Sequence, residues 1–221
     1  MRESFLLLVR ESFLAPTLAG IPSRTQGLRN PFRECRLSAT FPAMPRYRAN
    51  ECLPYFCAVT ILDWLPVLID ARYIDPVLDS LRFCREKKSL RLFAFVVMPN
   101  HLHLICSAGE ELHAVMRDFK RFTSRQIHDR LKADGRGSIL EWLRHATQGA
   151  RRDRDEWSLW QDGFHPQAIW GSEVFDQKLR YLHDNPVRKG LVRTPEEWWF
   201  SSASVYAGCR DYAMEVETID W

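Results

Sequence analysis

The sequence lacks any apolar run close to the roughly 20 residues that a membrane-spanning helix needs, so we predict no transmembrane segment. Its six cysteines include no C-x-x-C pair and are scattered over the 221 residues. Disulfide frameworks are typical of small, cysteine-dense secreted chains, so this scatter instead predicts free thiols in a reducing cytoplasm. The sequence also has no internal repeat, and its length suits one domain with appendages or at most two small domains.

The first 43 residues lack both lysine and aspartate, although they contain six arginines. An arginine-rich, acid-poor segment is typical of an organelle transit peptide, and the shortage of patterned apolar residues is typical of disorder. A start codon assigned too far upstream is a third interpretation, because "MPRYRAN" at Met44 resembles a natural beginning. We favour this third interpretation, and we expect the folded domain to span residues 44–208.

Charge is distributed unevenly along the chain, although the net charge is only +3. Six basic and two acidic side chains fall between residues 117 and 132, a composition compatible with nucleic-acid binding but not diagnostic of it. Residues 136–158 have no clear hydrophobic period, so we expect a charged loop or insertion there. The last eleven residues contain four acidic side chains and no basic ones, and we expect an acidic tail at residues 209–221.

Strand and helix signals alternate between residues 55 and 132 in the order strand, helix, strand, strand, helix. This order is most of a ferredoxin-like split β-α-β unit, so we predict the α+β class, with an antiparallel sheet and helices on one face. The second strand is apolar on both sides, which predicts a central position in the sheet. A third helix should begin with Ser172 as its cap and end before Pro186. The expected elements are the strands "YFCAVTIL", "SLRLFAFVVM" and "HLHLIC" and the helices at 74–88, 110–132 and 172–185.

Two histidines lie within the third strand signal, in the stretch "FAFVVMPNHLHLIC". Residues two apart in a strand point to the same face, so His101 and His103 project together while Leu102 and Leu104 point to the other face. Paired imidazoles of this kind can bind one divalent metal ion. They can equally be two partly exposed polar residues on a sheet, and two imidazoles alone are an incomplete metal site.

The third helix supplies further polar groups at helical spacing. Phe175, Leu179 and Leu182 form its apolar stripe, which should face the core. Tyr181 and Asn185 are four residues apart on a neighbouring stripe, so a phenol and a carboxamide can meet the same surface. Taken alone, this tyrosine is explained by packing at a core edge, and Asn185 by its position as the last residue before a proline.

Three separated motifs together resemble one protein family. "VVMPNHLHLI" resembles the His-hydrophobic-His (HUH) motif of single-tyrosine transposases. "WQDGFHPQAI" followed by "KLRYLHDNPVRKGLV" resembles the tyrosine helix of the REP-associated tyrosine transposases, and "PEEWWFSSASVY" resembles the C-terminal block of that group. The resemblance covers residues 44–208 and implies the ferredoxin-like HUH endonuclease fold.

The resemblance also implies roles for individual residues. His101, His103 and Asn185 would bind a divalent metal, Mg²⁺ or Mn²⁺, and Tyr181 would be the nucleophile. Attack by this tyrosine on DNA would give a 5′-phosphotyrosine intermediate and a free 3′-hydroxyl, which a second 3′-hydroxyl can reverse. The chain is therefore expected to be a transposase that cleaves and rejoins single-stranded DNA with hairpin structure, in the bacterial cytoplasm and associated with the nucleoid. A homodimer is left open.

A stripe of basic residues on the second helix is a candidate DNA-binding surface. Single-stranded nucleic acid is commonly bound by basic groups along its phosphates together with aromatic stacking. A solvated helix face explains the same charges equally well. The four residues of this stripe are Arg117, Lys120, Arg121 and Arg125.

Three alternatives to a transposase remain. A structural zinc site could use His101, His103, Cys106 and His113, although Cys106 should point away from the histidines. A non-catalytic ferredoxin-like module that binds RNA would leave the pairing of Tyr181 with Asn185 unexplained. A domesticated nuclease that nicks repeats without mobilising itself would use the same site.

Overall fold

The structure is a computed structural model, and it describes residues 46–48, 53–108, 111–148 and 158–220. The expectation for residues 1–43 therefore lies outside the described residues, as does part of the expected insertion, at 149–157. Among the described residues, no helix combines the length and the hydropathy needed to cross a membrane.

A four-stranded sheet forms the centre of the fold. Its strand order is β3-β4-β2-β5, and all three neighbouring pairs are antiparallel. The strand before the Pro99–Asn100 turn is rich in phenylalanine and valine, which suit a strand, and the strand after the turn is buried along its whole length. The predicted α+β class with an antiparallel sheet is confirmed. The strands are β2 (Tyr55–Thr60), β3 (Arg91–Met98), β4 (His101–Ser107) and β5 (Gln167–Ala168).

Strand β3 lies at the end of the strand order, so the prediction that it is central was wrong. It is apolar on both sides because both of its faces are covered, and a later segment also covers its outer edge. The Val97 amide donates to the Phe200 carbonyl at 2.8 Å, and the Ser202 amide donates to the Phe95 carbonyl at 2.9 Å. An edge protected in this way cannot pair with another chain.

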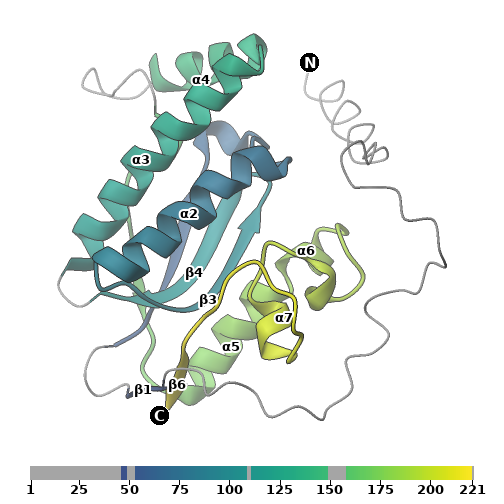
Figure 1. The fold of residues 1–221 in the computed structure, drawn as a ribbon. Coiled ribbons are helices and arrows are strands. Elements are labelled where there is room, and N and C mark those ends of the chain that lie inside the picture. The colour runs from purple at the N-terminus through teal and green to yellow at the C-terminus, as the bar shows by residue number, and fades with distance from the viewer. Residues whose placement is uncertain (1–45, 49–52, 109–110, 149–157, 221) are drawn as a thin grey trace. The chain divides into compact units, whose positions relative to one another are not determined.

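Helices cover both faces of the sheet (Figure 1). α2 (Ala71–Lys87) and α3 (Leu112–Ala133) share one face, as the sequence predicts, and pack on Leu102, Leu104 and other core residues. α5 (Ser172–His183) lies on the opposite face, where Phe175 and Leu182 join a second apolar cluster. The expectation that the helices lie on one face therefore holds for α2 and α3 but not for the tyrosine helix α5, which covers the second face. Short helices complete the fold: η2 (Leu62–Trp64), α6 (Asn185–Arg188), η4 (Pro195–Glu197) and α7 (Ala203–Tyr206).

A helix, α4 (Gly137–Gln148), occupies the first half of the expected loop at 136–158, so that prediction was wrong here. Leu143 is buried, and Ile139, Leu140 and Ala146 pack against the larger core cluster. Their spacing of one, three and three residues follows one helix face. The basic residues around this short stripe hid its period in the sequence.

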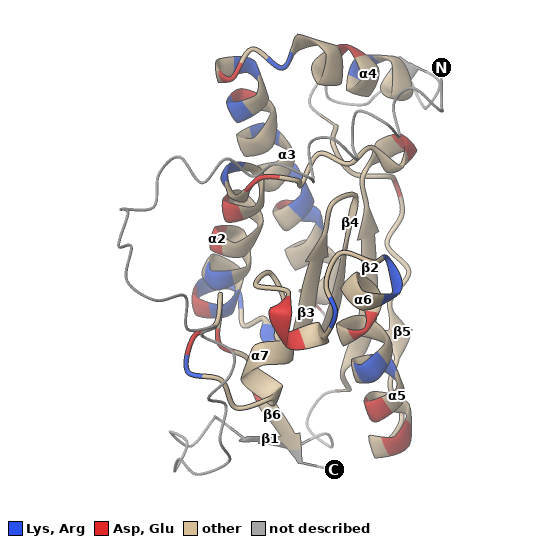
Figure 2. Cartoon of the chain, turned by 90° about the vertical axis from the view of Figure 1, so that its right-hand side faces the viewer, with Lys and Arg blue, Asp and Glu red and all other residues tan. Residues whose placement is uncertain are grey.

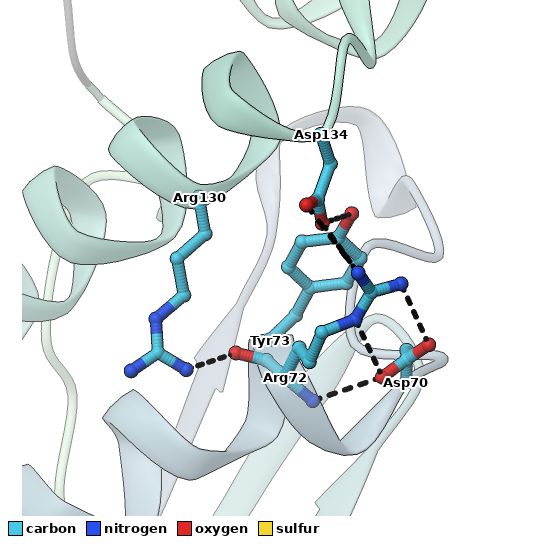
Figure 3. A network of polar contacts seen from close by, with 5 residues as sticks. All are labelled: Asp70, Arg72, Tyr73, Arg130 and Asp134. Atoms are coloured by element: carbon cyan, nitrogen blue, oxygen red, sulfur yellow. Dashed lines mark hydrogen bonds and ion pairs between the residues drawn. The ribbon is translucent and has the colours of Figure 1, made fainter. Parts of the chain in front are cut away.

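α2 begins three residues earlier than predicted, because Asp70 caps it by accepting from the Arg72 amide at 2.9 Å. Pro76 consequently lies inside the helix, where its missing N–H leaves the Arg72 carbonyl without its usual partner. The Arg130 guanidinium of α3 donates to that carbonyl (Figure 3). Tyr73 also donates to Asp134 at 2.7 Å, so the start of α2 is tied to the end of α3.

The described part of the acidic C-terminal segment packs on the domain. Met214 and Val216 are buried, and Glu217 forms an ion pair of 3.0 Å with Arg91 at the start of β3. The chain ends in β6 (Thr218–Asp220), which pairs in parallel with β1 (Arg46–Arg48). Residues before and after position 208, the predicted end of the domain, therefore share one core.

Candidate functional site

The two histidines of β4 lie on the sheet face that α5 covers. Their ring centroids are 4.8 Å apart, and the side chains are only 6% and 8% exposed, for His101 and His103 respectively. Leu102 and Leu104 are fully buried on the other face, in the cluster with α2 and α3. The alternation predicted from the sequence is therefore confirmed, and the leucines fix the strand while the imidazoles share one surface.

α5 brings Tyr181 to this pair. The centroid of its ring lies 5.7 Å from that of His103, and its side chain remains 41% exposed. Phe56 of β2 packs against both rings, with centroid distances of 5.1 Å to His103 and 5.9 Å to Tyr181. Three segments that are distant in sequence thus place a reachable phenol beside two imidazoles.

Burial keeps both imidazoles neutral at neutral pH. Desolvation lowers the pKa of His101 to about 4, and the positive charge of Lys189 lowers it further. Desolvation lowers the pKa of His103 to about 3, and His101 and Lys178 add to this effect. A neutral imidazole keeps a lone pair that can bind a metal ion. The low pKa values of the two histidines therefore favour a role as metal ligands over a role in binding protons.

The tautomer of His101 follows from its neighbour Asn100. His101 Nδ1 lies 2.7 Å from Asn100 Oδ1, and the amide nitrogen of Asn100 donates to the Trp64 carbonyl at 3.3 Å. An amide oxygen can only accept, so Nδ1 carries the proton and Nε2 keeps its lone pair. The buried Nδ1 of His103 has no hydrogen-bond partner of good geometry in the described part of the chain, and an interaction of this ring with the Cys57 backbone only partly opposes the fall in its pKa, so the imidazole would gain from a ligand.

Asn185 lies at the start of α6 and is buried. Its amide nitrogen donates to the carbonyls of Tyr181 and Leu182, at 2.8 and 3.4 Å, and so satisfies groups at the end of α5. Its amide oxygen takes no part in these two hydrogen bonds and is available for a further contact. No hydrogen bond joins Asn185 to either histidine in the described structure, so its role as third ligand stays a prediction. Among the described residues there is also no group of three or more His, Cys, Asp or Glu that could hold a metal, so a third protein ligand would have to be another residue type.

The residues of the alternative zinc site are not brought together. Cys106 lies on the opposite face from the histidines, and its sulfur is 3.8 Å from that of Cys57 in the core. His113 of α3 packs edge-on against Phe164, with ring centroids 5.1 Å apart. The strand-direction argument against this site is confirmed.

Three basic residues surround Tyr181, and two of them, Arg188 and Lys189, were not predicted from the sequence, whereas Lys178 was expected on the stripe of Tyr181. The Arg188 guanidinium lies over the Tyr181 ring, 5.5 Å from its centroid, and Lys178 lies 4.8 Å from the centroid of Phe56. Lys189 is close enough to His101 to lower its pKa. Arg188 follows Tyr181 by seven residues, a spacing that keeps both on the same helical stripe. The sequence prediction ended the helix before Pro186, so this stripe was not extended to Arg188. In the structure α6 follows α5 after the single residue Asp184, which also has helical dihedral angles.

The four basic residues predicted on α3 all line one groove of about 1180 Å³ between α3 and the segment 158–164. The structure divides them by their contacts. Lys120 donates to the carbonyls of Gln161 and Gly163, at 2.6 and 3.0 Å, and Arg117 pairs with Asp118 at 3.2 Å. Arg121 and Arg125 are exposed and have no ion-pair partner in the described residues. Figure 2 shows basic residues recurring along α3.

The N-terminus of α5 also differs from the sequence expectation. Gly171, with φ of 144°, is the cap residue, and Ser172 is the first helical residue. A backbone with this φ suits glycine because L side chains rarely adopt it. The position of Tyr181 on its stripe is unaffected.

No family model matches the sequence. A REP-associated tyrosine transposase of Escherichia coli is 26% identical over 137 residues, which cover 62% of this chain and 66% of the relative. A Haemophilus influenzae protein provisionally given the same name is 22% identical over 149 residues, covering 67% and 76%. An uncharacterised protein of H. influenzae is 25% identical over 99 residues, 44% of this chain, and the match spans about half, 55%, of that relative.

One solved structure with the same fold is a REP-associated tyrosine transposase bound to a REP hairpin. The match has a TM-score of 0.50 and 18% sequence identity, and it covers 84% of this chain and 95% of that one. The predicted resemblance to the REP-associated tyrosine transposases is therefore confirmed, in sequence and in fold.

Proposed function

We propose that this chain is a transposase that cleaves and rejoins single-stranded DNA through a covalent bond to Tyr181. The observation that carries the proposal is the convergence of His101, His103 and Tyr181, with ring centroids 4.8 and 5.7 Å apart, from a strand and a helix distant in sequence. A phenol that only packed at a core edge would not need two neutral, neighbouring imidazoles. The hairpin DNA bound by the solved relative supports a DNA hairpin as the partner of this chain.

The residues present fit a divalent metal ion. His101 would contribute Nε2, His103 supplies a neutral imidazole with an unpartnered nitrogen, and Asn185 would contribute its amide oxygen. Two nitrogens and one oxygen suit Mn²⁺ better than Mg²⁺, which prefers oxygen ligands. When bound, the ion would polarise the scissile phosphate and stabilise the leaving 3′-oxygen.

Each step of the reaction breaks one phosphodiester bond and forms another. The Tyr181 oxygen attacks the phosphorus and gives up its proton to solvent, the bond to the 3′-oxygen breaks, and that oxygen takes up a proton as a 3′-hydroxyl. The 5′ end of the downstream strand is then held as a phosphotyrosine. Attack by a second 3′-hydroxyl releases Tyr181 and joins the strands without an external energy source. Arg188 and Lys189 flank the ring and the histidines, where they can hold the phosphate oxygens.

DNA outside the reacting centre would lie against α3. Arg121 and Arg125 have guanidinium groups without an ion-pair partner among the described residues, so they are better placed than Lys120 to neutralise phosphates. We therefore propose that Arg121 and Arg125 contact DNA phosphates and that Arg117 contributes less to this contact. Lys120 instead holds the loop that forms the other wall of the groove.

The proposal is tested by incubating the full chain with a single-stranded DNA hairpin and Mn²⁺, followed by denaturing electrophoresis. DNA labelled at its 3′ end should give a labelled protein band, because the downstream fragment stays bound through its 5′ phosphate. DNA labelled at its 5′ end should give a shortened free fragment and no labelled protein. A chelator should abolish both products. Stable binding of DNA or RNA without any covalent band would instead favour the non-catalytic module.

A further inference from the structure

Two consecutive non-glycine residues in η2 adopt left-handed backbone conformations. Asp63 has φ of 50° and Trp64 has φ of 57°. A side chain in this region is crowded by its own backbone, so the conformation costs free energy, especially for a bulky aromatic residue. Such strain persists only where the surrounding structure imposes it, and it is concentrated at functional sites.

The strained turn is held by the loop that leads into β4. Asn100 donates its side-chain amide to the Trp64 carbonyl at 3.3 Å, and its backbone carbonyl accepts from the Ile61 amide at 2.9 Å. The neighbouring Leu62 and Leu65 are buried and anchor the turn on both sides. The oxygen of the same Asn100 side chain accepts from His101. One residue therefore couples the strained turn to the histidine pair.

The strain is not offset by burial of the indole. Trp64 is 57% exposed, and among the described residues its one ring contact is a T-shaped contact with His101, with centroids 5.9 Å apart. A tryptophan whose role was packing would bury most of its surface. The turn instead presents a flat apolar ring to solvent beside His101.

We infer that Trp64 is a stacking platform for a nucleobase of single-stranded DNA, next to the phosphate that Tyr181 attacks. The inference rests on the proposed function and adds a binding site to it. Base and phosphate of one nucleotide are joined through a single sugar, so a base on Trp64 holds its phosphate close to His101. Lys189, whose charge acts on His101, favours the same phosphate. Every base has a π face, so the platform fixes position rather than sequence.

Binding is tested by fluorescence anisotropy with a fluorescein-labelled 15-nucleotide oligothymidine, in a Tyr181→Phe background that prevents cleavage. Loss of base stacking typically weakens binding by about 5- to 150-fold, and this increase in Kd is expected for Trp64→Ala. Trp64→Phe keeps an aromatic face and should bind within a few-fold of the parent. The matched control is Trp142→Ala on α4, a tryptophan 50% exposed, which should bind like the parent. An unchanged Kd for Trp64→Ala would overturn the inference.

A glycine variant separates stacking from a structural role. Trp64→Gly removes the ring and relieves the backbone strain, because glycine adopts positive φ freely. It should melt at a higher temperature than Trp64→Ala, yet bind oligothymidine as poorly. If binding instead recovered together with the melting temperature, Trp64 would act only through the fold, and the stacking assignment would be wrong.

An abasic substrate locates the base. After the cleaved phosphate is mapped from the length of the free fragment, abasic sites are introduced on either side of it in the hairpin. One of them should slow adduct formation in the wild-type chain but have little further effect in Trp64→Ala. Equal slowing in both proteins would refute the platform while leaving the transposase proposal intact. Failure of the wild-type chain to form any adduct with the unmodified hairpin would remove the proposed function, and the inference with it.

Discussion

The guanidinium of Arg188 lies over the ring of Tyr181, with its central carbon 5.5 Å from the ring centroid. The Arg188 side chain is exposed, so its N–H groups can donate to the oxygens of a phosphate that is bound to Tyr181. Arg188→Gln should therefore slow adduct formation by about 10- to 100-fold, the range for loss of a hydrogen bond to a charged group. Arg180→Gln, an exposed position on α5, is the control and should react at the wild-type rate. Equal rates for the two variants in single-turnover assays would show that Arg188 only covers the ring.

The histidine pair and the leucines of β4 should respond differently to truncation. His101→Ala and His103→Ala should lose metal-dependent cleavage, because each removes one neutral imidazole from the site. Leu102 is fully buried on the other face, so Leu102→Ala should lower the free energy of unfolding by about 2–5 kcal/mol. Its cleavage rate per folded molecule should stay near wild type. Cleavage by either histidine variant at the wild-type rate in low Mn²⁺ would argue against the paired-imidazole site.

Three buried histidines predict that acid destabilises the protein. Burial lowers the pKa of His183 to about 4, as it does for His101 and, to about 3, for His103. Below about pH 6.5 the unfolded chain binds protons that the folded chain excludes, so stability is lost as the pH falls from there to about 4. Each histidine contributes up to about 1.4 kcal/mol per pH unit to this slope.

Urea unfolding at pH 7 and pH 5, with a chelator present, measures the acid sensitivity. His183→Gln removes one titrating group from the Ser202 contact and should reduce the difference in unfolding free energy between the two pH values. His145→Gln changes an exposed side chain on α4 and should leave that difference as it is. A His183→Gln variant with the full wild-type pH dependence would contradict the assignment.

Local periods in the sequence predicted the parts of the site that depend on one element. The two-residue spacing of His101 and His103 fixed their common face, and the four-residue spacing placed Tyr181 beside Asn185. The position of β3 at the sheet edge was not predictable in this way, because its apolar outer side is explained by the distant segment around Ser202. The positions of Phe56 and Trp64 near the histidines were not predicted either, because they depend on strand register and on a strained turn.

Asn185 can be tested with two substitutions that separate its contacts. Both Asn185→Asp and Asn185→Leu remove the amide donor that satisfies the Tyr181 and Leu182 carbonyls, so both should be less stable than wild type. The aspartate keeps an oxygen for a divalent cation, whereas leucine offers no ligand atom. If Asn185 is a ligand, the aspartate variant should retain cleavage per folded molecule and the leucine variant should not. Equal cleavage per folded molecule in the two variants would exclude the ligand role.

The most direct measurement of the central claim is the yield of covalent protein–DNA adduct from Tyr181→Phe. The substitution removes only the hydroxyl, so the ring keeps its contacts with Phe56, His103 and Arg188. Tyr212→Phe is the matched control, because it removes an exposed phenol hydroxyl from the C-terminal segment. With a 3′-labelled hairpin and Mn²⁺, the account predicts no adduct from Tyr181→Phe, unchanged hairpin affinity, and wild-type adduct from Tyr212→Phe. An adduct from Tyr181→Phe at the wild-type level would contradict it.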